Sequence, residues 1–487
     1  MKKGKNEIMN SYKFKIFAVL AVLFVFQACT QDFEEINDNP NFPTVDEANP
    51  ALILPKILFE AGNEMTARIA WGTGNIIAQL VATNNFTGTD RYLLGTYEGT
   101  WNLLYRNLRD ANNLLALAET TDNGGYQAAA LTLRAWMLAN LTEMYGDVPY
   151  SEALQGKESI FLPKYDSQAD IYVAILDDLQ NAVNAAAKGG SMAGDILYGG
   201  NTDNWAKLAN SLRMRYLMRL ENKWDDLGID GAALMQGIVN SGVHFISNDD
   251  NGAVPYLSAT NRWPLNTARV GSFDEKRMSQ RIEGVLKDLN DPRMEILFRV
   301  VDNPDSDEFI GVPNGLSEDA ASNFNGGANN QSRLGFRFRE EPASVEMMIM
   351  HYSELMFIVA EAVQKGYISG NAADFYNAGV EANMSYLGIA DASAYLANAD
   401  VALTTNELER IATQKWLSLF MVGNEAWYDY RRTGLPALTP GPNAVLSELP
   451  VRIQYPTSEQ VLNAGNYEAA VSGQGPDENT TKMWLLK

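Results

Sequence analysis

The sequence predicts a mainly α-helical protein of stacked helical hairpins, with one loop-rich region between two groups of them. Apolar residues recur at helical spacing in several segments, and these segments come in pairs with short connections. Between about residues 247 and 342 the composition shifts to Gly, Asn, Pro and Asp, which is typical of surface loops that carry a binding function. The 34-residue tetratricopeptide signature is not legible, so any repeat is degenerate.

Five segments carry the helical pattern. Residues 172–183 follow Ser167-x-x-Asp170, which resembles a capping box, and Thr404-x-x-Glu407 predicts another helix start. One helix is predicted to stop at Gly146, and in the loop-rich region only residues 273–289 look helical. The apolar positions are Leu131, Ala135, Leu138 and Tyr145; Tyr172, Leu176, Leu179 and Val183; Trp205, Leu208, Ala209, Leu212 and Tyr216; Leu355, Ile358, Val359 and Ala362; and Leu408, Ala412, Trp416 and Leu419.

The charge of the chain excludes some classes of partner. The 487 residues include 38 basic and 60 acidic side chains, which gives a net charge of −22. Such a chain repels phosphate backbones, so we expect no nucleic-acid partner. It also lacks the polybasic character that attaches proteins to anionic lipid. Hydrophobic residues make up 46% of the chain, enough for a large packed core.

The N-terminal segment resembles a secretion signal. Lys13 and Lys15 precede Ile16–Phe26, which is a run of eleven apolar residues. This run is shorter than the roughly 20 residues of a bilayer-spanning helix, and it is typical of the hydrophobic region of a signal peptide. We therefore expect residues 1–28 to be a signal peptide, with Met1 or Met9 as the start.

Cys29, the single cysteine of the chain, is predicted to carry a lipid anchor. A small residue, Ala28, precedes it, as in a bacterial lipobox, although Phe26 and Gln27 replace the usual leucine and small residue. A chance cysteine with cleavage elsewhere is the alternative. The acidic TQDFEE that follows resembles the tag that sends some Gram-negative lipoproteins to the outer face of the outer membrane. Residues 29–50 are polar and contain Pro40 and Pro43, so they are predicted to be an extended tether.

Six stretches resemble signatures of SusD/RagB-type outer-membrane lipoproteins, in particular the SusD-like branch with a short NPN-containing N-terminus. No single stretch is diagnostic, but six of them in order after a lipobox are highly specific. They are INDNPNFPT (36–44), LRAWMLANLTEMYGDVPYSEAL (133–154), LNDPRMEILF (289–298), HYSELMFIVAEAV (351–363), NEAWYDYRRTGLP (424–436) and LPVRIQYPTSEQVLNAGNY (449–467).

The resemblance implies a function as well as a fold. Members of this family are non-enzymatic, with four tetratricopeptide-like helix pairs and a variable, loop-rich side. Anchored to the outer membrane by an N-terminal lipid, they cap a SusC-like TonB-dependent transporter and capture oligosaccharides or, in some members, peptides. For this chain it implies a SusD-like domain over residues 51–487, exposed to the cell exterior. We also expect no cofactor and no metal.

Exposed aromatic residues beside polar ones are the expected ligand contacts. The C–H face of a sugar packs on an aromatic ring, while its hydroxyl groups need amide or guanidinium partners. Two loop segments offer this combination, and burial under a long loop is the alternative for each aromatic. The candidates are Tyr256, Asn261, Arg262 and Trp263 in VPYLSATNRWPLN, and Asn85, Phe86, Arg91 and Tyr92 in NNFTGTDRY. Trp101 is expected to be a core residue instead.

Several charged residues are predicted to be structural. Arg431 and Arg432 precede Gly434, a pattern that favours helix termination over a ligand clamp. Glu354 and Glu361 share one helix face and are predicted to pair with an arginine such as Arg134.

Other chemistries have weaker support. His244 and His351 lack zinc-ligand spacing. Asn303, Asp305 and Asp307 alternate as in a calcium loop, but a glutamate replaces the required glycine. A surface glycoside hydrolase remains the alternative function, because 60 carboxylates could supply an acid and a base.

Overall fold

Four helix pairs of the described residues form the scaffold, which confirms the helical hairpins predicted from the sequence. The computed structural model describes residues 48–257, 260–266, 273–341 and 343–487. The chain divides into two units, Met1–Asn49 and Pro50–Lys487, and the elements below belong to the second. The pairs are α5 (Glu98–Thr120) with α6 (Gly124–Tyr145), α7 (Gln168–Ala186) with α8 (Thr202–Arg219), α15 (Tyr352–Gln364) with α16 (Ala372–Tyr386), and α18 (Glu407–Ser418) with α19 (Glu425–Thr433).

Further elements pack with these pairs. In the described residues the chain starts with α3 (Pro50–Asn63), which continues through a π-helix, η2 (Glu64–Gly74), into α4 (Asn75–Ile77). Three antiparallel two-stranded sheets of the described residues join β1 (Val81–Thr83) with β5 (Lys276–Met278), β2 (Val148–Pro149) with β3 (Tyr165–Asp166), and β4 (Gly252–Pro255) with β6 (Glu346–Met350). The other described α-helices are α9 (Trp224–Leu227), α10 (Gly231–Ser241), α12 (Gln280–Asp288), α13 (Met294–Leu297), α14 (Glu318–Asn323), α17 (Ser393–Leu396), α20 (Thr457–Leu462) and α21 (Ala464–Gln474).

Two predicted helix boundaries are confirmed. The side chain of Ser167 caps α7 by accepting a hydrogen bond of 3.1 Å from the backbone N–H of Asp170. Helix α6 ends at Gly146, whose φ of +89° is a backbone conformation that glycine adopts readily.

Two other boundaries are wrong. Helix α18 begins after Asn406, which has a φ of +49°, and no side chain caps it, so Thr404 is not its cap. Residues 273–289 are not one helix, because Lys276–Met278 pair with β1 as a strand. The helix α12 starts only after Ser279, whose hydroxyl accepts a hydrogen bond of 3.1 Å from the N–H of Ile282.

Two buried ion clusters, both of which include α19, connect the helix pairs. Each cluster contains three carboxylates and three cations, so each is neutral overall. The first contains Glu143, Glu354, Glu425, Arg215, Arg219 and Arg431. The second contains Glu221, Glu361, Asp429, Lys365, Lys415 and Arg432.

These clusters correct part of the sequence interpretation. Glu354 pairs with Arg215 and Glu361 pairs with Arg432, whereas Arg134 pairs with Asp178 at 2.6 Å. Gly434 does end α19 in the left-handed conformation, as predicted, with a φ of +69°. The two arginines before it are buried ion-pair partners, so they do more than complement the end of the helix.

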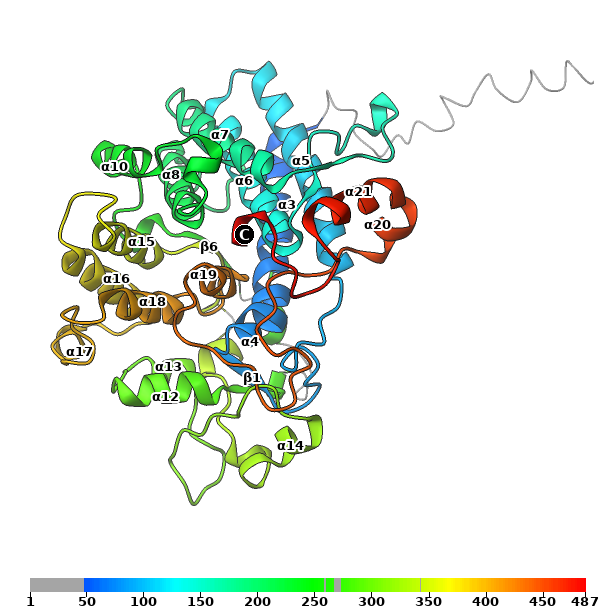
Figure 1. The fold of residues 1–487 in the computed structure, drawn as a ribbon. Helices are drawn as coiled ribbons and strands as arrows, with labels where there is room; N and C mark the ends of the chain where they lie inside the picture. Colours follow the sequence, from blue (N-terminus) through cyan, green and yellow to red (C-terminus); the bar gives the residue numbers. More distant parts are fainter. Residues whose placement is uncertain (1–47, 258–259, 267–272, 342) are drawn as a thin grey trace, which may run out of the picture. The chain divides into compact units, whose positions relative to one another are not determined.

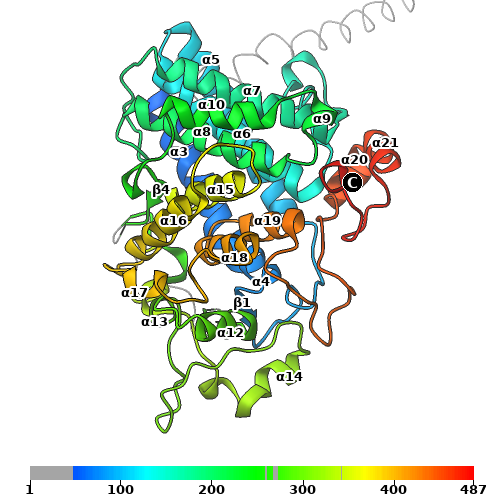
Figure 2. The same cartoon turned by 60° about the vertical axis from the view of Figure 1, so that its left-hand side comes forward.

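The arrangement leaves one end of the unit to loops and short elements. In both views, α5, α7, α8 and α10 lie at one end and α12, α13 and α14 at the other (Figure 1, Figure 2). The segment that follows α19 runs toward β1 and α12 (Figure 1). Segments that are distant in sequence therefore meet beside the sheet formed by β1 and β5.

Candidate ligand-binding site

Trp263, one of the aromatic residues predicted to contact a ligand, is a core residue. Its side chain is fully buried, and its Nε1–H donates a hydrogen bond of 2.7 Å to the carbonyl oxygen of Phe338. The ring centroid lies 6.0 Å from that of Trp71 and 5.2 Å from that of Tyr256. Tyr256 is also buried, and its hydroxyl donates to Asn63 Oδ1 at 2.8 Å. The burial of both rings contradicts the predicted aromatic platform, because a stacking surface must be open to the ligand.

Asn261 and Arg262 lie on the surface, apart from these rings. Both side chains are exposed, and the backbone N–H of Leu257 donates to the carbonyl oxygen of Asn261 at 3.1 Å. Residues 258–259 and 267–272, on either side, lie outside the described residues. The structure therefore does not bring the four residues of this predicted set to one surface.

The residues of the second predicted set also differ in their exposure to solvent. Phe86 is 69% exposed and Asn85 is half-buried, whereas Tyr92 is buried. Arg91 is structural, because its Nε–H donates to the carbonyl oxygen of Asn443 at 3.0 Å and its own carbonyl accepts from Val445 N–H at 2.9 Å. Phe86 is thus the one predicted aromatic that is available for stacking. As predicted, Trp101 lies in the core.

A cleft of about 430 Å³ lies at the loop-rich end of the unit. This volume is within the range of about 300–1,000 Å³ that is usual for small-molecule sites. Its walls come from the turn after α4, from α12, from residues 313–314 and from residues 439–442. The polar side chains that line it are those of Gln79, Gln280, Arg281, Asp288, Asn314 and Thr439.

Hydrogen bonds from Asn314 connect one wall of the cleft to β1. Its Nδ2 donates hydrogen bonds of 2.9 Å to the carbonyl oxygen of Val81 and of 2.7 Å to Asp90 Oδ1. The other oxygen of Asp90 accepts from the backbone N–H of Thr83 at 3.0 Å. These bonds hold the loop of residues 84–93, which carries Phe86, against the wall of the cleft.

Two glycines allow the loops to approach closely. Gly315 has a φ of +72°, and its carbonyl oxygen accepts from Asn443 N–H at 2.8 Å. A Cβ atom at Gly441 would lie 1.8 Å from the carbonyl oxygen of Asn314. A larger residue at Gly441 would therefore push the two cleft walls apart.

The charges at the cleft nearly cancel. Among the described residues that line it, Arg281 is the one cation and Asp288 the one anion. Behind the wall, burial raises the pKa of Asp90 to about 6, although the hydrogen bonds from Thr83, Asn314 and Gly315 act in the opposite direction. The lining thus offers amide and charged groups for hydrogen bonding without a strong net field.

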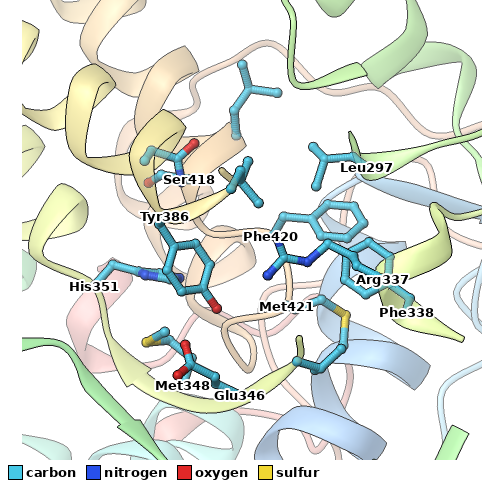
Figure 3. A pocket seen from close by; sticks show the side chains of 14 residues that line it. Leu297, Arg337, Phe338, Glu346, Met348, His351, Tyr386, Ser418, Phe420 and Met421 are labelled. Carbon is cyan, nitrogen blue, oxygen red and sulfur yellow. The ribbon is translucent and has the colours of Figure 1, made fainter. Parts of the chain in front are cut away.

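A second cavity, shown in Figure 3, is too small for a sugar. Its free volume of about 30 Å³ admits water molecules but not a sugar ring. Phe338, Phe420 and other apolar side chains form much of its wall (Figure 3). Burial lowers the pKa of His351 to about 3, with further contributions from Arg215 and Arg337, so this imidazole is neutral at physiological pH.

Sequence reasoning missed the residues that line the cleft. Asn314 and the residues around Gly441 lie in the turn-forming stretches VPNGL and TPGPN, which predict loops but not their contact. Gln280 and Arg281 lie on a short amphipathic helix and carry no signal of their own. The predicted sites were centred on aromatic residues, although amides are equally suited to binding hydroxyl groups.

The described residues contain neither a metal cluster nor a membrane-spanning helix. No three of their His, Cys, Asp and Glu side chains are placed to hold a metal ion. None of the helices in this part of the chain combines the length and the apolar character that a bilayer requires.

Comparison with known proteins identifies the family. Residues 41–456 match the sequence model of a SusD-like family described as starch-binding and associating with the outer membrane. No curated protein sequence matches the chain.

Solved structures share the fold over most of the chain. A SusD homologue from Bacteroides fragilis superposes with a TM-score of 0.77 at 29% identity, covering 90% of this chain and 99% of that one. A chitin-binding protein gives 0.79 at 26% identity, with coverages of 90% and 99%. A chitin-binding SusD homologue from Flavobacterium johnsoniae gives 0.76 at 24% identity, with coverages of 89% and 98%, and supports the fold alone. The sequence match and these superpositions show that the chain belongs to the SusD-like family of outer-membrane-associated proteins.

Proposed function

We propose that this protein is a cell-surface lipoprotein that captures an oligosaccharide and delivers it to a SusC-like TonB-dependent transporter in the outer membrane. The observation that carries the proposal is the cleft of about 430 Å³ at the loop-rich end of a SusD-like fold. The family description names starch, and one structural relative is described as chitin-binding. A nutrient-binding function for this chain is consistent with both.

The chemistry of the cleft favours a neutral, hydroxyl-rich ligand. The exposed amide of Gln280 can donate to or accept from a hydroxyl group, whereas Asn314 offers an acceptor oxygen because its amide hydrogens bond Val81 and Asp90. Arg281 and Asp288 contribute opposite charges, so an acidic or basic peptide gains little from the electrostatic field. Phe86 does not line the cleft, but it lies on the loop that Asp90 joins to the cleft wall, and its exposed ring is available for stacking.

Binding without turnover is favoured over glycoside hydrolysis. Most glycosidases place two carboxyl groups on either side of the scissile bond, about 5–10 Å apart. Among the described residues that line the cleft, Asp288 is the one carboxylate. This lining lacks the second carboxylate that a surface hydrolase would need.

The N-terminal residues supply the attachment in this proposal. Residues 1–28 would be removed as a signal peptide, and Cys29 would carry the lipid. Residues 29–50 would then connect the anchor to the binding unit. The family description, which includes association with the outer membrane, supports this arrangement.

Calorimetric titration of the purified protein with chitohexaose and with maltoheptaose tests the proposal. We expect one of these neutral oligosaccharides to bind and to be recovered intact. Release of new reducing ends would instead favour the hydrolase. If neither these probes nor a wider panel of oligosaccharides and peptides bound, nutrient capture would be contradicted.

A pair of glutamine variants locates the site. Gln280→Ala removes an exposed amide from the cleft, whereas Gln364→Ala removes an exposed amide from the end of α15. We expect the first variant to weaken binding several-fold and the second to leave it unchanged. Equal affinities of the two variants would place the ligand outside the cleft.

A further inference from the structure

The carboxamide of Asn314 has a fixed orientation. An amide nitrogen carries two hydrogens, and both are used here, at 2.9 Å to Val81 O and at 2.7 Å to Asp90 Oδ1. The reversed orientation would place the amide oxygen against a carbonyl and a carboxylate, which both accept hydrogen bonds. The chemistry of the two partners therefore decides which end of the amide faces β1.

The oxygen of the same amide is left available. Asn314 lines the cleft and is half-buried, and its Oδ1 accepts no hydrogen bond from the described part of the chain. A carbonyl oxygen accepts but cannot donate, so this point of the cleft has a defined polarity. A ligand hydroxyl or amide N–H can satisfy it, whereas an ether oxygen cannot.

Asp90 holds this orientation from a buried position. Its side chain is buried, and Lys276, whose strand β5 pairs with β1, attracts its carboxylate electrostatically. Its oxygens accept from Thr83 N–H at 3.0 Å and from Asn314. Since Thr83 belongs to β1, whose register with β5 pairs it with Lys276, the carboxylate is fixed to the sheet.

We propose that Asp90 is a positioning residue that presents Asn314 Oδ1 to the cleft, and that this oxygen selects a ligand bearing a hydrogen-bond donor. The inference rests on the proposed function, because it assumes that the cleft binds the nutrient. It adds a specificity rule to that function: the bound sugar presents a free hydroxyl or an acetamido N–H to Asn314. A sugar with an ether or a methylated oxygen at this point would leave the acceptor unpaired.

The first part of the test uses whichever of chitohexaose and maltoheptaose the wild-type protein binds. Asn314→Ala removes the acceptor and should weaken binding about 5- to 20-fold. Partially O-methylated forms of the same oligosaccharide are then titrated. One of them should bind the wild type about 5- to 20-fold more weakly than the unmodified sugar does. Asn314→Ala should bind that form and the unmodified sugar equally well. Unchanged affinity of Asn314→Ala would overturn the inference.

The second part separates positioning from general support of the fold. Asp90→Asn leaves one side-chain oxygen to accept from Thr83, Asn314 and Gly315, so it should weaken binding by a similar factor. The double variant should bind no more weakly than Asn314→Ala, because Asp90 acts through Asn314. A double variant whose loss of affinity equals the product of the two single losses would contradict this relation. If Asp90→Asn does not fold, Asp90→Ser leaves space for a water that can accept from these donors, and the same comparison applies.

A matched control lies elsewhere in the scaffold. Asp195 is also a buried carboxylate, and it accepts from the backbone N–H groups of Leu197, Tyr198 and Gly200. Asp195→Asn should lower thermal stability without changing affinity, and a loss of affinity in this variant would refute a local effect of Asp90. If the wild-type protein bound no oligosaccharide, the proposed function itself would fail, which differs from every outcome above.

Discussion

Arg215 and Glu354 form a doubly hydrogen-bonded ion pair inside the helical scaffold, with both side chains 1% exposed. The guanidinium Nε and Nη2 lie 2.6 Å from Glu354 Oε1 and 2.6 Å from Oε2, respectively. Glu354→Gln keeps the size of the side chain but removes its charge, so the guanidinium retains Glu425, at 3.3 Å, and the carbonyl oxygen of Ile349, at 2.9 Å. We expect the free energy of unfolding, measured by urea denaturation, to fall by about 3–5 kcal/mol.

The matching control for this variant is an exposed pair. Glu152 lies 3.6 Å from Lys164, and the two side chains are 34% and 57% exposed. Glu152→Gln should change the free energy of unfolding by no more than about 1 kcal/mol, because water already solvates both charges. If both variants were equally stable, the buried clusters would not contribute to stability as described.

Trp263 and Phe86 should behave in opposite ways when truncated. Trp263→Ala removes a fully buried ring and should lower the free energy of unfolding by about 3–5 kcal/mol. Phe86→Ala should leave stability within about 0.5 kcal/mol but weaken oligosaccharide binding about tenfold. Melting curves and calorimetric titrations of the two variants separate these effects. A stable Trp263→Ala protein with weakened binding would restore the aromatic site expected from the sequence.

Asp90 should make stability depend on pH. Burial raises its pKa to about 6 in the folded protein, against 3.8 for the unperturbed group, so the folded state holds the proton more tightly than the unfolded state. Its stabilising contribution is therefore fully present below about pH 4 and is lost as the pH rises through 6. The loss is on the order of 2–3 kcal/mol.

Denaturation of Asp90→Asn alongside the wild type isolates this titration. The difference in unfolding free energy, wild type minus variant, should fall between pH 4 and pH 7, because the asparagine does not titrate. Parallel stability curves for the two proteins over that range would show that Asp90 has an ordinary pKa.

Cys29→Ala should abolish acylation, because the thiol is the atom that would carry the lipid. Growth with a radioactive fatty acid, followed by immunoprecipitation, measures the label on each protein. We expect labelled wild type in the outer-membrane fraction and an unlabelled variant released from it. Equal labelling of the two proteins would rule out Cys29 as the anchor.

The acidic residues after Cys29 should determine which face of the membrane displays the protein. Replacing Asp32, Glu34 and Glu35 with Ala should leave the protein lipidated but facing the periplasm. Antibody staining of intact cells measures this directly. Undiminished staining of the triple variant would remove the export-tag interpretation.

Local sequence patterns predicted the helices well, because helix formation depends on near neighbours. Ser167 and Gly146 act at the ends of α7 and α6 as their positions in the sequence suggest. The prediction that Thr404 caps α18 is wrong, because Asn406, two residues later, adopts the left-handed conformation at the start of this helix. The strand Lys276–Met278 could not be recognised, since its partner β1 lies nearly 200 residues earlier.

The candidate site was less predictable, because it depends on contacts between distant loops. Composition identified the loop-rich region but could not show that Trp263 turns inward to meet Trp71 and Phe338. Nor could it show that Asn314 meets Asp90, 224 residues away. The arginine partners of Glu354 and Glu361 were likewise misassigned, because spacing indicates which helix face a residue occupies but not which helix it faces.

The ion clusters of α19 also bear on how the molecule unfolds. In a simple helical repeat array each repeat contacts only its neighbours, so the array can open one repeat at a time. Here Arg431 bonds Glu143 of α6, Glu425 pairs with Arg215 and Arg219 of α8, and Arg432 pairs with Glu361 of α15. Detaching α19 would leave charges unpaired in three earlier helices at once, so the helix pairs should melt together in a single cooperative transition.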